Sequence, residues 1–221
     1  MHVRQCFWEN QLGYVAGLKG GWQSYELFMA PINCRLESGD RFEFNFVPKG
    51  ERLFEAFEVA DGVSIPSGSY HFNRFRLEGG LAAKRRLSAQ ATWWFGRFYD
   101  GHLNEYELTG SWKPSPLFIV EFSGEHNVGR VRNGRIVQDL IGTRLRVNVS
   151  PDLQLNSFLQ YDNESQSFGT NSRFRWTFSP LGELFVVYDH NMGTRQLSAR
   201  RSRFEFASNQ LAVKIQYAFR Y

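Results

Sequence analysis

Charged side chains recur at every second position along several segments, and they are the residues best able to do chemistry in this sequence. In "NRFRLEG" (73–79), arginine and glutamate alternate with apolar residues, and "RFRWTF" (173–178) repeats the pattern. Opposite charges on neighbouring strands can pair, and arginine forks bind carboxylates well. The charged set consists of Glu43, Arg74, Arg76, Glu78, Glu105, Glu107, Arg144, Arg146, Arg173, Arg175, Lys214 and Arg220.

These side chains point away from an apolar stripe, so in a barrel they would line the lumen. The simpler interpretation is an ion-pair network that fills the interior. The functional interpretation is a polar conduit whose arginine rows attract anionic or hydroxyl-rich solutes. The alternation permits both.

Catalytic patterns are missing from the sequence. It has no glycine-rich phosphate loop, no HExxH motif and no nucleophile elbow. Four histidines fall near expected loop ends and could gather on one rim with Ser69, Asp100, Asp189 or Glu125 as a hydrolytic or metal site; they are His71, His102, His126 and His190. Scattered surface histidines are far commoner, so no catalytic residue, metal or cofactor is assigned.

The elements that must position the charged residues are strands. Helical periodicity is nearly absent, whereas alternation with a period of two recurs along the chain. Most of the expected spans exceed the about 9–11 residues that a tilted strand needs to cross a bilayer. The spans are 5–18, 22–36, 40–54, 68–82, 86–99, 102–112, 116–126, 135–149, 152–163, 168–178, 182–192 and 209–221.

The connections are expected to alternate in length. Tight turns are expected at 37–40, 83–86, 113–116, 150–152 and 179–182. Longer connections are expected at 55–67, 100–102, 127–134, 164–167 and 193–208, and segment 55–70 is apolar enough to fold over a barrel mouth. Short turns at one end and longer loops at the other are typical of outer-membrane barrels.

Aromatic residues are expected to form two girdles at the ends of the strands, as at bilayer interfaces. One girdle lies at the tight turns and the end of the sequence, and it consists of Trp112, Phe178 and Tyr221. The other lies beside the longer loops, and it consists of Tyr70, Phe98, Tyr99, Tyr161 and Tyr188. The last segment, "VKIQYAFRY" (213–221), alternates up to a final aromatic residue. It resembles the strand signature that barrel-assembly machinery recognises, with Tyr217, Phe219 and Tyr221 as its aromatic positions.

Composition bounds the remaining possibilities. No run of about 20 apolar residues exists, so a transmembrane helix is not expected. The net charge of +4 is mild, and without a motif it does not favour a nucleic-acid partner. No signal peptide is visible. Cys6 and Cys34 could pair, but two unpaired cysteines are the favoured interpretation.

Several stretches resemble one bacterial envelope family. They include "WWFGRFYDG" (93–101), "NQLAVKIQYAFRY" (209–221) and the most distinctive block, "LQYDNESQSFGTNSRFRWTFSP" (159–180). Members of that family carry an N-terminal family 9-like carbohydrate-binding domain followed by a domain of unknown function that reads as an outer-membrane β-barrel. The resemblance implies a C-terminal fragment without the binding domain and earlier strands, and it transfers no catalytic residue.

The sequence therefore predicts an all-β, antiparallel up-and-down meander. We expect an outer-membrane-type β-barrel of about 12 strands, forming a single domain over residues 1–221, in a Gram-negative cell. Its expected role is passage or surface display linked to carbohydrate. Expected partners are outer-membrane lipid and lipopolysaccharide, the barrel-assembly machinery and an oligosaccharide. A membrane-embedded hydrolase with a loop-rim site and a soluble lipocalin-like binding barrel are the alternatives.

Overall fold

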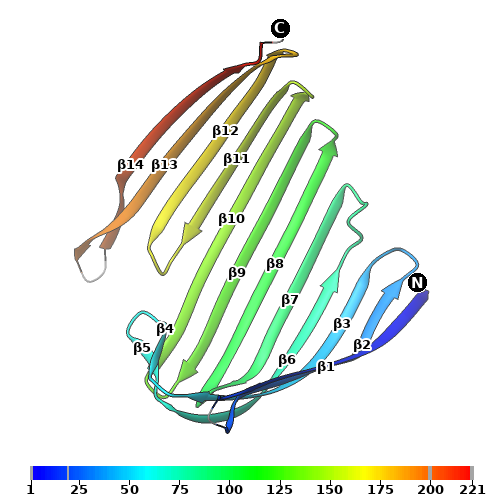
Figure 1. The fold of residues 1–221 in the computed structure, drawn as a ribbon, viewed down its shortest axis with the longest axis vertical. Coiled ribbons are helices and arrows are strands. Elements are labelled where there is room, and N and C mark those ends of the chain that lie inside the picture. Colours follow the sequence, from blue (N-terminus) through cyan, green and yellow to red (C-terminus); the bar gives the residue numbers. More distant parts are fainter. Residues whose placement is uncertain (1, 19, 199–200, 220–221) are drawn as a thin grey trace. The chain divides into compact units, whose positions relative to one another are not determined.

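The computed structural model describes residues 2–18, 20–198 and 201–219, and these residues form strands and turns only. Twelve strands make one antiparallel sheet in sequence order, while β4 and β5 form a separate hairpin (Figure 1). The strands are β1 (Val3–Ala16), β2 (Trp22–Leu36), β3 (Arg41–Leu53), β4 (Phe57–Ala60), β5 (Val63–Ile65), β6 (Gly68–Gly80), β7 (Leu87–Phe98), β8 (Gly101–Ser115), β9 (Phe118–Val131), β10 (Gly134–Ser150), β11 (Leu153–Asp162), β12 (Ser167–Ser179), β13 (Gly182–Ser198) and β14 (Arg201–Tyr217).

The expected all-β, up-and-down meander of about 12 long strands is confirmed. Each strand of the sheet lies beside the next along the chain, except that β3 pairs with β6 across the hairpin, and β1 and β14 form the edges. The period-two alternation produces this arrangement because each strand presents one apolar and one polar face. In the described part of the chain, no helix is long and apolar enough to cross a membrane.

The sequence predicts one domain, but the contacts group the residues into two compact units. Unit 1 contains residues 1–109 and 125–138, and unit 2 contains residues 110–124 and 139–221.

The sheet of unit 1 buries charged and amide side chains and exposes large aromatic ones. The side chains of Asn45 and Arg74 are 0% and 3% exposed, while Phe42 and Trp93 are 45% and 36% exposed. The register explains this burial: Phe44 pairs with Leu77 and Phe46 with Phe75, so the aromatic residues share the face opposite the charged ones. We call these two sides of the sheet the apolar face and the polar face.

Unit 2 has the same two faces. On its apolar face Trp176 and Ile215 are 45% and 71% exposed. Leu184 lies opposite Ile215 in the register of β13 and β14, and Trp176 lies opposite Leu184. Large apolar side chains of neighbouring strands therefore form a continuous exposed surface.

The expectation that tight turns alternate with longer loops is largely wrong. Residues 127–131 belong to β9, and residues 193–198 and 201–208 belong to β13 and β14, so these expected loops are mostly strand. Between β7 and β8 only residues 99 and 100 lie outside strands. Backbone pairing continues into these segments, as between Thr194 and Phe204, because no proline removes a backbone donor there. The link from β3 to β6 is long, as expected.

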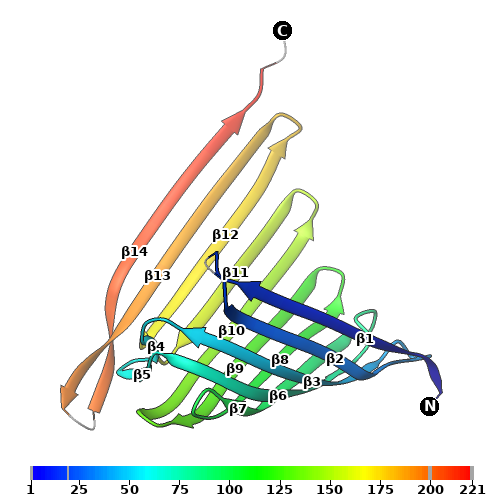
Figure 2. The same ribbon diagram turned by 60° about the horizontal axis from the view of Figure 1, so that its bottom comes forward.

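That link folds back as the β4–β5 hairpin and packs on the sheet within unit 1 (Figure 2). Val63 and Ile65 form a buried cluster with Leu103, Val131 and Ile136. Two side-chain amides also anchor the hairpin: Asn133 Nδ2 donates to the carbonyl of Ser64 at 3.0 Å, and Gln138 Nε2 donates to that of Val59 at 3.2 Å. The apolar segment thus has its own small core.

The hairpin corrects part of the expected aromatic girdle. Tyr70, Phe98 and Tyr99 pack against the hairpin core instead of joining the apolar face, and the rings of Tyr70 and Tyr99 meet edge to face at 5.2 Å. Tyr99 donates a hydrogen bond to Glu51 Oε2 at 2.6 Å. Burial and this bond to a carboxylate raise the pKa of the Tyr99 phenol.

Cys6 and Cys34 are joined in a disulfide that links β1 to β2. The two residues are direct partners in the register of these strands, which brings their Cα atoms to 4.1 Å. The favoured interpretation of two unpaired cysteines is therefore wrong. The sequence could not reveal the pairing, because it depends on how β1 and β2 align.

Candidate solute-binding face

The structure places the expected charged residues on the polar face. Glu43 lies opposite Glu78 in the register, and Asn45 and Val47 lie opposite Arg76 and Arg74. In unit 2, Arg144 and Arg146 alternate with apolar residues of β10, and Arg173, Arg175 and Lys214 follow the same alternation in β12 and β14. Glu105 and Glu107 share this side of β8, since Glu105 pairs with Arg74. Arg220 and Tyr221 lie outside the described residues.

In unit 1 the polar face is an ion-pair network. Arg76 donates to Glu43 Oε1 at 2.6 Å, and its Nε donates to Asn45 Oδ1 at 2.7 Å. Arg41 pairs with Glu78 at 2.5 Å. Each of these arginines therefore meets a carboxylate.

Arg74 is the most buried member of this network. It pairs with Glu105 and also donates to the carbonyl of Leu103 at 2.6 Å. Since Arg74 is 3% exposed, its charge depends on these partners. Glu107 lies on the same face but is exposed, and the described residues give it no ion pair. The network supports the structural interpretation of the charged set in unit 1.

Unit 2 divides its arginines into two kinds. Arg146 pairs with Glu121, and Arg175 pairs with Glu183 at 2.6 Å. Arg144 and Arg173 have no carboxylate partner among the described residues. Lys214 lies 6.0 Å from the centre of the Phe185 ring.

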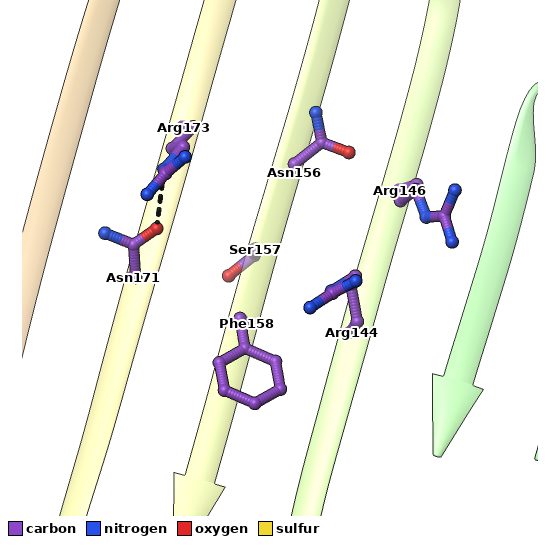
Figure 3. A pocket seen from close by; sticks show the side chains of 7 residues that line it. All are labelled: Arg144, Arg146, Asn156, Ser157, Phe158, Asn171 and Arg173. Carbon is purple, nitrogen blue, oxygen red and sulfur yellow. Dashed lines mark hydrogen bonds between the residues drawn. The ribbon is translucent and has the colours of Figure 1, made fainter. Parts of the chain in front are cut away.

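The two arginines without a carboxylate open onto one hollow of about 610 Å³ (Figure 3). They come from β10 and β12, the strands on either side of β11. The hollow is lined by Arg144, Arg146, Asn156, Ser157, Phe158, Asn171 and Arg173. The guanidinium carbon of Arg144 lies 5.3 Å from the centre of the Phe158 ring. This contact holds Arg144 by a cation–π interaction and leaves the N–H groups at the guanidinium edge available.

A chain of hydrogen bonds orients Arg173. Its Nε donates to Asn171 Oδ1 at 2.9 Å, as the dashed line in Figure 3 shows. Asn171 Nδ2 in turn donates to Asp189. With Nε engaged, the two terminal amino groups of the guanidinium remain to meet a solute. Asn156 lies on β11 between Arg146 and Arg173 in the register, and the described residues give its side chain no hydrogen-bond partner.

The expected charged set does not include the neutral and acidic partners of the arginines, and Asp189 is expected only at a histidine rim. These partners, all on the polar face, are Glu121, Glu183, Asp189, Asn156, Phe158 and Asn171. Their positions in the alternation carry a signal, because Asn171 is two residues from Arg173 and Asn156 is two residues from Phe158. Which acid meets which arginine depends on register between strands, which the sequence does not display.

The four histidines do not join the polar face. His71 lies beside Tyr25 with a 3.1 Å contact from the Tyr25 hydroxyl to Nδ1, and His126 stacks on Tyr106 at 6.1 Å. His190 lies next to Asp189 in sequence but on the opposite side of β13, and it contacts Asn209 at 2.6 Å. His102 and Tyr106 are four residues apart on β8, so their side chains lie on the same face, opposite Glu105 and Glu107. Among the described residues no three histidine, cysteine or acidic side chains could hold a metal.

The expected interface residues lie exposed at the ends of strands. Trp112 and Phe178 are 51% and 43% exposed, while Tyr217 and Phe219 are 50% and 76% exposed. Tyr217 is the last residue of β14, and its ring meets that of Phe219 at 5.1 Å. That these residues contact a membrane interface or an assembly factor stays a prediction.

Comparisons with known proteins add no family or relative: no family model matches the chain, and neither a curated protein nor a solved structure does.

Proposed function

We propose that the chain forms the wall of a β-barrel in the outer membrane of a Gram-negative cell and serves the passage of polar solutes. The observation that carries the proposal is the reversed burial, with Arg74 3% and Ile215 71% exposed. A sheet in water would lose free energy by exposing so many large apolar side chains, whereas a sheet facing lipid would gain it. The apolar face would contact lipid and the polar face would line an aqueous path.

Strand length supports the same proposal. The strands of the sheet span 10 to 17 residues, and a tilted strand crosses a bilayer with about 9–11. Exposed aromatic residues near strand ends, such as Trp112 and Tyr217, are suited to the level of lipid headgroups. Lipid, lipopolysaccharide and the barrel-assembly machinery are the proposed partners.

A link to carbohydrate is part of the proposal. Its support is the resemblance in sequence to envelope proteins with a carbohydrate-binding domain, together with arginine and amide groups on the polar face. Surface display is the other role compatible with such a wall. A barrel that serves passage should conduct ions across a bilayer, whereas one that serves display alone need not.

The test is refolding of the purified full chain from denaturant, into plain buffer and into detergent micelles or lipid vesicles. We expect folding only with detergent or lipid, and stepwise conductance when vesicles fuse with a planar bilayer. A monomer that folds in plain buffer with its apolar face covered would overturn the membrane proposal. Insertion without conductance would favour display over passage.

A further inference from the structure

We propose that the hollow around Arg144 and Arg173 binds hydroxylated carboxylates, the sugar acids being the class that fits best. This inference deepens the proposed function, since it requires the polar face to be open to water. It rests on four properties of unit 2: two arginines without a carboxylate, their fixed orientation, a free amide and the volume of the hollow.

The charge of the hollow comes from two of its three arginines. Glu121 neutralises Arg146, while Arg144 and Arg173 have no ion pair in the described part of the chain. Asp189 is also bonded into the cluster, but Asn171 stands between it and Arg173 in the chain of hydrogen bonds. A planar guanidinium binds a carboxylate through two parallel hydrogen bonds, so the two arginines favour carboxylate groups.

Both arginines are oriented before a solute arrives. Phe158 supports the guanidinium of Arg144, and Asn171 holds Nε of Arg173. Side chains that are already ordered lose less conformational entropy on binding than free ones. A surface arginine in a solvated row would lack such supports.

The neutral groups and the size of the hollow point to a solute with hydroxyls. The amide of Asn156, which lines the hollow and lies opposite Arg173 in the register, offers both a donor and an acceptor, and hydroxyl groups can use both. The hollow of about 610 Å³ is far larger than a simple inorganic anion needs, and it lies within the range of about 300–1,000 Å³ for small-molecule sites. Carboxylates that meet the two arginines and hydroxyls that meet the amide describe an acidic sugar.

The experiment measures binding to the folded full chain in detergent micelles by titration calorimetry. The probes are trigalacturonate, the neutral maltotriose and acetate, each at low and at high salt. We expect trigalacturonate to bind at least about tenfold more tightly than either other probe, and more weakly at high salt. Equal affinity for maltotriose, or for acetate, would overturn the proposal.

Variants locate the site. Arg144→Gln and Arg173→Gln are each expected to weaken trigalacturonate binding about tenfold, and Arg144→Lys is expected to restore only part of the affinity because lysine lacks the planar fork. The matched control is Arg175→Gln with Glu183→Gln, which removes a neutral pair from the same face. If the control weakens binding as much as Arg173→Gln, the assignment is wrong.

Conductance separates this inference from the proposed function. Binding in micelles by a chain that gives no conductance would contradict passage but support the site. Conductance with no preference for trigalacturonate in either assay would support passage and overturn the site.

Discussion

Val186 and Val187 are consecutive residues of β13 whose side chains lie on opposite faces of the sheet. Val186 pairs with Val213 on the apolar face, whereas Val187 lies opposite Arg173 and Ala212 on the polar face. The two positions share residue type, strand and backbone environment. They therefore offer a matched comparison of the two faces.

Glutamate at these two positions should have opposite effects. Val186→Glu is expected to destabilise the chain in lipid vesicles by about 1–2 kcal/mol, because under the proposed function a carboxylate on the apolar face must leave water. Val187→Glu should change stability by less than about 0.5 kcal/mol, since surface substitutions without a buried role do little and Arg173 lies opposite. Denaturant unfolding in vesicles measures both. Equal costs, or a larger cost at Val187, would contradict the assignment of the faces.

The buried pair of Arg74 and Glu105 should be sensitive to loss of one partner. Glu105→Gln removes the charged partner and leaves the guanidinium the carbonyl of Leu103 and the ring of Phe98, whose centre is 6.0 Å from the guanidinium carbon. We expect a loss of about 3 kcal/mol, at the lower end for broken buried pairs because Glu105 is 34% exposed. Adding Arg74→Met should recover most of this loss. A double variant as unstable as Glu105→Gln alone would show that the buried charge is not the cause.

Asp40 should make folding stability depend on pH in acid. It lies in the turn between β2 and β3, where the backbone N–H of Ala82 donates to Oδ1 at 2.9 Å. The hydroxyl of Ser38 and the guanidinium of Arg85 each donate to Oδ2 at 2.8 Å. These hydrogen bonds, that of Ala82 first, lower the pKa of Asp40 below its ordinary value of 3.8.

Because the pKa is lower in the folded chain, the stabilising effect is complete above pH 3.8 and is lost as the pH falls through the folded value. Asp40→Asn should therefore be less stable than the parent at pH 7, and the difference should shrink below about pH 4. Unfolding midpoints in detergent across this pH range provide the measurement. A difference that stays constant down to pH 2 would rule out a contribution from ionisation.

The hairpin should depend on its own small core. Ile65 is 0% exposed and packs among Leu103, Val131 and Ile136. Ile65→Ala is expected to cost about 2–4 kcal/mol and to expose residues 54–67 to protease, because it leaves a cavity under the hairpin. Phe54→Ala, at a position 66% exposed, is the control in the same segment. Unchanged protection in Ile65→Ala would contradict the packing described above.

The disulfide should stabilise the first strand. Cys6 and Cys34 are separated by 28 residues. Cross-linking them is expected to raise the free energy of unfolding by about 3 kcal/mol, because it lowers the conformational entropy of the unfolded chain. Cys6→Ser with Cys34→Ser should release residues 2–18 to protease before the rest of unit 1. Intact mass with and without a thiol-blocking reagent checks the bond, and labelling of both cysteines in the untreated chain would contradict it.

Much of the sheet could be predicted because a strand with one apolar face leaves a period-two record in its residues. The bounds of β2 and the shared face of Arg173 and Arg175 follow from that record alone. The period-two pattern does not show how far two neighbouring strands stay paired. The strand residues between 193 and 208 were therefore expected as a loop. Contacts that cross strands, such as those of Asp189 with Asn171 and of Cys6 with Cys34, depend on register and stayed hidden for the same reason.

The oxidation state of Cys6 and Cys34 depends on the compartments through which the chain has passed. Disulfides persist in oxidising compartments and are rare where thioredoxin and glutathione keep thiols reduced. A newly made chain in a reducing cytosol would carry Cys6 and Cys34 as thiols, with β1 held to β2 by backbone pairing alone. For a chain exported as proposed, the covalent link would form only after it had left that compartment, so the oxidation state of this cysteine pair would distinguish exported from unexported molecules.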